Sequence, residues 1–171
     1  GRPSKIVFAG IGKNTREIQY ALDLDIFVFN VESREELDNI NRVAIGVSKT
    51  ARVALRLNPD IDPGTHAKTT TGKKENKFGI DIKTARELFN DDYLPSLKGV
   101  RLVGLHVHLG SPIWTPEPYV RALKKIKDYQ SFCRKQGAKI EYINIGGGYC
   151  ISYTGEAVAR PADYAKKILP V

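Results

Sequence analysis

The chain has 171 residues, of which 42% are hydrophobic and 27% are charged, and this composition suits a globular domain with one core. No apolar run approaches the roughly 18 residues that a membrane-spanning helix needs. The net charge of +8 comes from scattered lysines and arginines, so we expect solvated helix faces and no nucleic-acid surface. The densest basic clusters are Lys73–Lys74, Lys124–Lys127 and Lys166–Lys167.

Short apolar runs rich in β-branched and aromatic residues alternate along the chain with helical patterns. The predicted strands lie at residues 6–10, 26–32, 52–58, 102–109 and 140–145. The predicted helices lie at 15–23, after 33, and at 83–90, 116–136 and 161–169, and a long polar loop runs from 60 to 77. A loop of that length in a compact domain is typical of a functional or mobile segment.

Several residues mark where these helices begin and end. Thr15 is predicted to cap the first helix, with Glu17 in its first turn. Ser33 followed by Glu36 has the spacing of a capping box. Gly137 lies just past the long helix, where a glycine commonly ends one.

Five strands, each followed by a loop and a helix, predict a parallel sheet with helices outside it. An open doubly wound sheet and part of an eight-stranded barrel both fit this order. Polar side chains at the carboxyl ends of the strands favour the barrel, because they would all line one rim. They are Asn30, Glu32, Arg56, Asn58, His106, His108 and Asn144. A whole barrel needs about 250 residues, so about three units would lie outside this chain.

The stretch Leu105–Ser111 places two histidines, His106 and His108, on the same side of one strand. Paired histidines can bind zinc, although the only other histidine is His66 on the polar loop. Alternatively, both imidazoles are held by hydrogen bonds at the end of a barrel. The interpretation that we favour is a ligand site, in which a flat imidazole stacks on an aromatic ring and Ser111 binds an anion.

Three glycines, Gly146–Gly148, follow the last predicted strand. Glycines there let the backbone approach a ligand closely and direct N–H groups at a phosphate. A tight turn that merely needs positive φ is the alternative. The stretch is not a dinucleotide fingerprint, because no G-x-G-x-x-G pattern occurs, and Gly10–Lys13 lacks the pattern of a P-loop.

Arg56 is predicted to face the barrel interior from its strand, where a partly buried charge needs a partner. The residue either forms an ion pair that supports the barrel or tunes a neighbouring cofactor and its stacking histidine. The segment Thr71–Ile80 is by itself a charged loop before a helix.

The two cysteines, Cys133 and Cys150, form neither a disulfide framework nor a zinc motif, which favours a reducing, cytoplasmic setting. The start of the chain leads directly into a strand, so we expect no signal peptide. The sequence contains no Met, and we therefore expect a processed, trimmed or internal piece of a longer protein.

Together and in order, these motifs resemble the diaminopimelate/ornithine decarboxylase family, pyridoxal-phosphate enzymes with an alanine-racemase-like barrel of fold type III. The resemblance covers nearly the whole chain and is strongest to the diaminopimelate branch. It implies an α/β fold, a (β/α)8 TIM-type barrel, of which this chain holds five consecutive βα units with strands three to seven. The stretches that carry it are Ile6–Lys13, Phe29–Ser33, Arg56–Asp60, Thr65–His66, Thr71–Lys73, Lys77–Ile80, His106–Ser111 and Gly146–Gly148.

The resemblance also implies roles for single residues. His108 would stack on the pyridine ring of pyridoxal 5'-phosphate, Arg56 would lie beside His108 in the active site, and Lys77 would lie toward a dimer interface. The cofactor phosphate would be held by Ser111, Gly146, Gly147 and Gly148. No metal is implied.

The reaction implied is decarboxylation of a diamino acid, most closely of meso-2,6-diaminopimelate to L-lysine and CO2, by a cytoplasmic homodimer with shared active sites. The family's Schiff-base lysine motif, its eighth-strand motif and its C-terminal β domain do not occur here. We therefore expect residues 1–171 to be a partial barrel domain that is inactive alone. Three alternatives stay open: a decarboxylase for ornithine, arginine or carboxynorspermidine, a metal-dependent barrel hydrolase using His106 and His108, and a non-catalytic relative.

Overall fold

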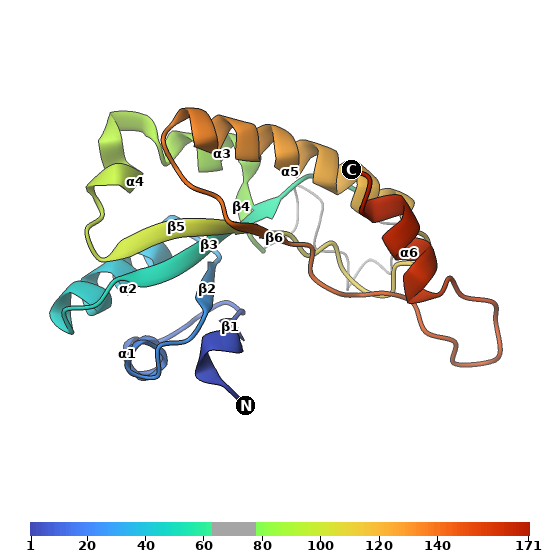
Figure 1. Cartoon of the computed structure of the whole chain (residues 1–171), viewed down its shortest axis with the longest axis horizontal. Helices are drawn as coiled ribbons and strands as arrows, with labels where there is room; N and C mark the ends of the chain where they lie inside the picture. The colour runs from blue at the N-terminus through green and yellow to red at the C-terminus, as the bar shows by residue number, and fades with distance from the viewer. Residues whose placement is uncertain (63–77) are drawn as a thin grey trace.

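The computed structural model of the protein describes residues 1–62 and 78–171. Its strands are all parallel, and five of them follow one another across the sheet in the order β1-β2-β3-β5-β6, while β4 pairs with β3 alone. The strands are β1 (Val7–Phe8), β2 (Val28–Val31), β3 (Ala51–Asn58), β4 (Ile80–Asp81), β5 (Val100–His106) and β6 (Tyr142–Asn144). The five strands of this path thus lie side by side in chain order, as in the wall of a barrel (Figure 1).

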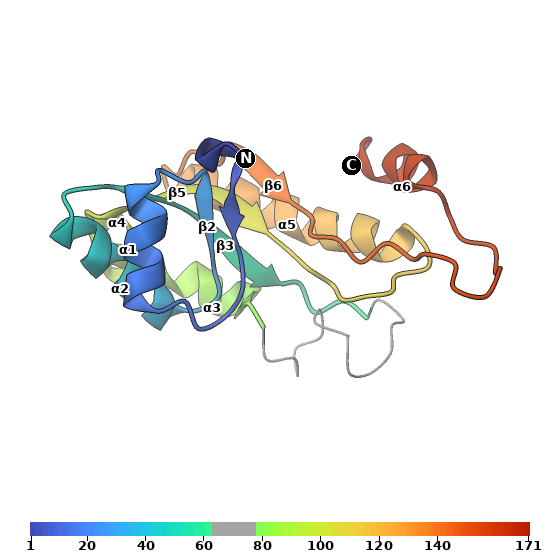
Figure 2. The same cartoon turned by 90° about the horizontal axis from the view of Figure 1, so that it is seen from below.

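Helices connect the strands on the outer side of this curved sheet (Figures 1 and 2). The helical elements are η1 (Pro3–Lys5), α1 (Thr15–Asp23), α2 (Arg34–Gly46), α3 (Ile82–Glu87), η2 (Asn90–Asp92), α4 (Tyr93–Ser96), α5 (Glu117–Lys135) and α6 (Pro161–Ile168). The last of them, α6, lies apart from the sheet and packs against α5. None of the helices in the described ranges is both long and apolar enough to cross a membrane.

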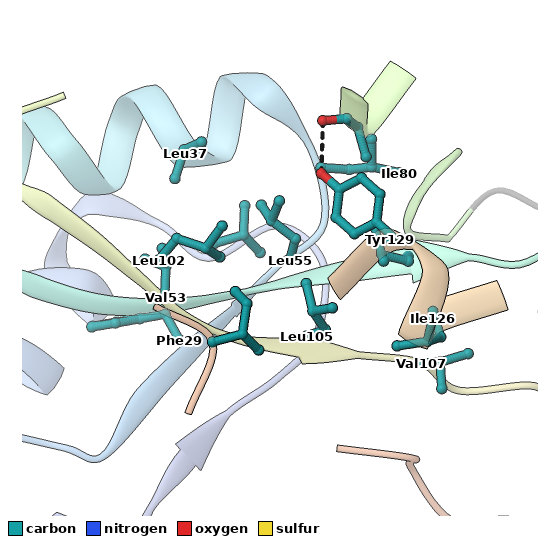
Figure 3. Packing of buried hydrophobic residues seen from close by; sticks show 14 of the residues in the cluster. Phe29, Leu37, Val53, Leu55, Ile80, Leu102, Leu105, Val107, Ile126 and Tyr129 are labelled. Atoms are coloured by element: carbon teal, nitrogen blue, oxygen red, sulfur yellow. Dashed lines mark hydrogen bonds between the residues drawn. The ribbon is translucent and has the colours of Figure 1, made fainter. Parts of the chain in front are cut away.

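The main core lies between the sheet and the helices (Figure 3). Phe29 and Leu55 point outward from β2 and β3, and Leu37 of α2 packs with them, all at most 1% exposed. Each such side chain contributes about 1.5–3 kcal/mol on leaving water. Tyr129 of α5 is fully buried as well, and its hydroxyl donates to Ala85 O at 2.8 Å, which ties α5 to α3.

The opposite face of the sheet is apolar only near its middle. Val28, Ala54 and Val103 form a second buried cluster there, and Phe27 and Tyr142 pack against it. Further along the same strands, toward their carboxyl ends, this face becomes polar. This polar part of the face forms the floor of the candidate site.

The cap of α1 differs from the prediction. The N-cap residue is Asn14 and not Thr15: Asn14 Oδ1 accepts from Glu17 N at 3.0 Å, and the Glu17 carboxylate accepts from Asn14 N at 2.9 Å. Glu17 lies three residues after Asn14, so the pair has the spacing of a capping box.

The capping box predicted for α2 does not close. Ser33 Oγ accepts from Glu36 N at 3.2 Å, as expected. The Glu36 carboxylate, however, accepts from Glu32 N at 2.7 Å and from Lys13 Nζ at 3.0 Å. Glu36 therefore joins the end of β2 to the loop after β1, and does not cap its own helix.

The helix predicted at 83–90 is shorter than expected. It spans Ile82–Glu87, and its N-cap is Asp81, whose Oδ1 accepts from Lys83 N at 2.8 Å. Asp91 and Asp92 then adopt left-handed φ values of 51° and 54°, which interrupt the helical path before α4. The strand predicted at 102–109 also ends early, at residue 106.

Candidate functional site

The carboxyl ends of three neighbouring strands bring polar side chains into one row. Arg56 of β3 is in register with His106 of β5, and His106 is in register with Asn144 of β6. These positions alternate with the outward-facing core residues, so the three side chains lie on the inner face of the sheet. Asn30 of β2 lies one layer lower, level with Ala54 and below Arg56.

Arg56 is buried, and its charge is paired with a carboxylate. Its Nη1 donates to both carboxylate oxygens of Glu32, at 2.8 Å each, and the two side chains are 11% and 5% exposed. The guanidinium carbon also lies 5.4 Å from the centroid of the Phe78 ring. Glu32 comes just after β2, so this ion pair joins the ends of two adjacent strands.

The two histidines lie at different depths. Burial lowers the pKa of His106 to about 3, with smaller effects from Arg56, His108 and Lys13. Burial and then Arg56 also lower the pKa of His108, against an opposing effect of Glu32. Both imidazoles are therefore neutral near pH 7, and neither repels the Arg56 guanidinium.

The glycine segment packs directly on the segment that follows β5. A Cβ on Gly148 would lie 1.9 Å from Gly110 O, and φ is +94° at Gly148. A Cβ on Gly146, where φ is +75°, would lie 2.7 Å from Val107 O and 2.8 Å from His108 Nδ1. Gly147 between them has open space where a side chain would be. Two of the three glycines are thus required by backbone contact, as well as by their φ values.

Backbone and tyrosine hydrogen bonds fix the two segments together. Ile113 N donates to Gly148 O at 2.7 Å, and Cys150 N donates to Ile113 O at 3.2 Å. The Tyr119 hydroxyl of α5 donates to Gly147 O at 2.7 Å, and that of Tyr164 in α6 donates to Ile113 O at 2.6 Å. These contacts bring Ser111, which is exposed, to the same end of the sheet as the glycines.

Two of the glycine N–H groups already have acceptors within the protein. Gly146 N donates to Asn144 Oδ1 at 2.8 Å, and Gly147 N lies 3.4 Å from its acceptor His108 Nδ1. A neutral imidazole that accepts at Nδ1 carries its proton on Nε2. The Gly147 amide can bind a phosphate, as expected, only if its contact with His108 Nδ1 breaks. That contact is long for a hydrogen bond.

The residues present fit a flat, anionic cofactor such as pyridoxal phosphate. His108 offers a neutral, half-buried imidazole, and Gly147 has no side chain that would block the approach of a ligand. The buried Nδ1 of His106 has no partner within the described part of the chain, so a polar group remains at the floor of the site. Within residues 1–62 and 78–171, no three His, Cys, Asp or Glu side chains gather as a metal site requires.

Not every predicted residue can be placed. Lys77, expected near a dimer interface, and His66, the third histidine, lie outside the described residues. Conversely, the motifs did not reveal the role of Tyr119 or Tyr164, because nothing in the sequence links these tyrosines to the segments that they hold. Lys125, predicted to be a solvated lysine, is exposed but donates to Pro59 O at 2.7 Å.

The family model for the pyridoxal-binding domain of pyridoxal-dependent decarboxylases matches residues 1–171. The chain is 42% identical over 171 residues to a diaminopimelate decarboxylase of Aquifex aeolicus, and 37% identical over 169 residues to that of Haemophilus influenzae. These alignments include 98% and 99% of the chain and 40% of each relative. The chain thus spans about two fifths of the length of these curated relatives.

Solved structures agree with the sequence relatives. The diaminopimelate decarboxylase of Helicobacter pylori complexed with L-lysine superposes with a TM-score of 0.93 at 37% identity, over 99% of this chain and 42% of that one. An arginine decarboxylase of Paramecium bursaria Chlorella virus gives 0.77 at 27% identity, over 99% of this chain and 41% of that one. The predicted α/β barrel wall is confirmed by these likenesses and by the parallel sheet.

Proposed function

Because the chain belongs to the family of pyridoxal-dependent decarboxylases, we propose that the intact protein converts meso-2,6-diaminopimelate to L-lysine and CO2. The similarity to diaminopimelate decarboxylases at 36–42% identity across nearly the whole chain supports this substrate. The viral arginine decarboxylase is less similar, at 27%. In the reaction the bond from the α-carbon to the carboxylate breaks, CO2 leaves, and a proton takes its place.

The observation that carries the proposal is the contact between the glycine segment and the residues around His108. Gly146 and Gly148 leave no room for a Cβ against Val107, His108 and Gly110. This packing places a flat, neutral imidazole next to open space at Gly147. A ring and a phosphate on the same cofactor need these two features side by side.

In the proposed site His108 would stack on the pyridine ring of the cofactor. Ser111, Gly146, Gly147 and Gly148 would hold its phosphate. Pyridoxal 5'-phosphate supplies, when bound, the electron sink for the pair of electrons released as CO2 leaves. The place of His108 directly after β5 positions its imidazole beside the glycine segment.

Arg56 supplies a fixed positive charge beside this ring. Its ion pair with Glu32 keeps the guanidinium on the inner face of the sheet, where its charge contributes to the low pKa of both histidines. The His108 imidazole is therefore uncharged near pH 7, and its π face would be available to the cofactor. Any protonation of His108 would bring a second cation against Arg56.

We propose that residues 1–171 form part of a pyridoxal-binding barrel domain, with the rest of the barrel and a β domain elsewhere in the intact protein. The relatives, which are more than twice as long, support this division. We also propose a homodimer with shared active sites, with Lys77 toward the interface. The two cysteines are buried and free, which supports a cytoplasmic protein.

The test is product formation by the intact protein supplied with pyridoxal phosphate. We expect L-lysine from meso-diaminopimelate at about 1 per second or more, and much slower turnover of L-ornithine and L-arginine. Faster turnover of either of the other two amino acids would move the assignment to another branch of the family. If none of the three amino acids is turned over, the protein is a non-catalytic relative of this family.

A further inference from the structure

Lys13 is a buried lysine that the proposed mechanism does not use. It lies on the loop after β1, and its side chain is 1% exposed. The ammonium donates to three acceptors from different parts of the chain. They are Gly10 O at 2.5 Å, Asn30 O at 2.8 Å and Glu36 Oε1 at 3.0 Å. A charge buried this deeply is costly unless every proton has an acceptor, and here each has one.

The contacts of Lys13 continue to the active site through two glutamates. Glu36 accepts from Lys13 through Oε1 and from the backbone N–H of Glu32 through Oε2, at 2.7 Å. The Glu32 carboxylate in turn accepts from Arg56 Nη1 at 2.8 Å. All four side chains are at most 11% exposed. The network, defined as Lys13, Glu36, Glu32 and Arg56, consists of two ion pairs that are joined by the hydrogen bond from Glu32 N to Glu36.

The order of these contacts matters for what Lys13 can do. Glu36 holds the backbone of Glu32 at the point where β2 ends, and Lys13 holds both Glu36 and the carbonyl of Asn30 two residues earlier. Through these contacts Lys13 fixes the backbone that carries Glu32, and with it the position of the Glu32 carboxylate. Arg56, at the other end, is the member that lies beside the histidines.

We propose that Lys13 and Glu36 are positioning residues, which fix Glu32 and through it hold the Arg56 guanidinium beside His106 and His108. This inference rests on the proposed function, because it concerns the proposed active-site arginine. Neither residue belongs to the row of polar side chains at the strand ends, and Lys13 acts on that row directly only through a small lowering of the His106 pKa. Replacing Lys13 or Glu36 should therefore lower turnover only in a protein that still contains Arg56.

A double-mutant cycle on the intact protein tests this dependence. The variants are Lys13→Met, Arg56→Gln and the double variant, assayed with pyridoxal phosphate and meso-diaminopimelate. We expect Lys13→Met to lower kcat about tenfold or more with a smaller change in KM, and to have little further effect in the Arg56→Gln background. Losses that multiply in the double variant would overturn the proposal. An inactive wild-type protein would instead contradict the proposed function.

Lys49 supplies a control that matches Lys13 in its hydrogen-bond acceptors, with a side chain that is 32% exposed against 1% for Lys13. It donates to Leu22 O at 2.7 Å, Asp23 O at 3.4 Å and Asp25 Oδ1 at 3.0 Å, so it also joins two carbonyls and a carboxylate, but far from the site. Lys49→Met should leave kcat unchanged within about twofold. An equal loss of kcat at Lys49 and Lys13 would point to general destabilisation and overturn the positioning role.

A second readout uses the protein without cofactor. Within the described residues, the charged and titratable groups that act on His108 are Arg56 from β3, Glu32 from the end of β2 and His106 from β5. Lys13 is not among these groups, so a rise of the His108 pKa in Lys13→Met reports movement of Arg56 or of its partner Glu32. NMR titration should show that rise, and a larger one in Arg56→Gln. An unchanged His108 pKa in Lys13→Met would refute the mechanism.

If Lys13→Met does not fold, Glu36→Gln takes its place in the double-mutant cycle with Arg56→Gln. The amide retains an acceptor for Glu32 N and almost the same volume, but loses the charge that pairs with Lys13. We expect a smaller fall in kcat that again disappears when Arg56 is replaced by Gln. A fall in kcat that persists without Arg56 would contradict the proposal.

Discussion

His106 and His108 point to the same side of the chain, yet their surroundings separate their roles. His106 ends β5 and is 6% exposed, with its Nδ1 buried. His108 follows the strand, is half-buried, and accepts from Gly147 N in the glycine segment. Only His108 therefore lies at the level where a cofactor ring and the glycines can meet.

This difference predicts unequal effects of alanine substitution on turnover. His108→Ala removes the ring that stacks on the cofactor and should lower kcat about tenfold or more, whereas His106→Ala should cost clearly less. Parallel kinetics of the two variants with meso-diaminopimelate measure the ratio. Equal losses, or a larger loss at His106, would reverse the assignment.

The low pKa of His106 predicts a pH-dependent stability. Its pKa is about 3 when folded, against 6.5 in a model peptide. Below pH 6.5 the unfolded chain binds a proton that the folded protein does not, so the free energy of unfolding falls as the pH falls, by up to about 1.4 kcal/mol per pH unit. The contribution is complete above pH 6.5 and is lost progressively toward pH 3.

Urea unfolding of the wild type and His106→Asn at pH 6.5 and pH 5 checks this sign. The wild type should lose about 2 kcal/mol more than the variant over that interval. His108 is present in both proteins and cancels in the comparison. If the two proteins lose the same amount, His106 is not the buried neutral imidazole described above.

At the scale of elements, the glycine segment and the strand end of β5 form one unit. The unit is joined by the Ile113–Tyr149 bridge and by Tyr119 and Tyr164 from the two helices that flank it. Its geometry leaves Gly147 open but encloses Gly148. The three adjacent glycines should therefore differ sharply in their tolerance of a methyl group.

We predict that Gly148→Ala weakens binding of pyridoxal phosphate and destabilises the fold by about 1–3 kcal/mol, because its Cβ would collide with Gly110 O at a φ of +94°. Gly155→Ala controls for φ alone, since φ there is +90° with open space around it. Fluorescence titration with the cofactor and thermal unfolding measure both effects. Equal losses of stability and cofactor binding at Gly148 and Gly155 would show that the φ value, and not the contact with Gly110 O, causes them.

The sequence predicts most elements but not their ends. Apolar runs bounded by Pro59 and by the glycine segment identify β3 and β6, because a buried strand leaves that pattern. The break after α3 depends on left-handed backbone at Asp91 and Asp92, and Asp gives only a weak preference for it. Strand β4 has two residues, too few for any periodicity.

The candidate site was predictable where motifs are local. His108, Ser111 and the three glycines belong to two short stretches, and the structure brings these stretches together. The partner of Lys13 was not predictable, since Glu36 lies 23 residues away and has the spacing of a capping residue. Contacts of this kind depend on which strand ends become neighbours, and a single sequence does not state that.

For the whole molecule, the described sheet has β1 and β6 at its two edges. The relatives are more than twice as long as this chain, and we propose that a Schiff-base lysine lies in the remainder of the intact protein. The proposed site therefore needs groups from the remainder of the protein. An unpaired strand edge also leaves backbone N–H and C=O groups without partners.

We predict that the 171-residue chain, produced by itself, forms no L-lysine from meso-diaminopimelate even with pyridoxal phosphate. The intact protein, assayed in parallel, is the control. Turnover by the isolated chain of about 1 per second or more would show that the 171 residues contain the complete catalytic machinery.

A crystal structure of the intact protein with pyridoxal phosphate is the most direct test of the central claim. We expect the pyridine ring against the His108 imidazole, with the phosphate within about 3 Å of Ser111 and of backbone N–H groups in Gly146–Gly148. The Arg56–Glu32 ion pair should be intact beside it. A cofactor bound elsewhere, or a phosphate that contacts neither Ser111 nor the glycine segment, would contradict the proposed cofactor site.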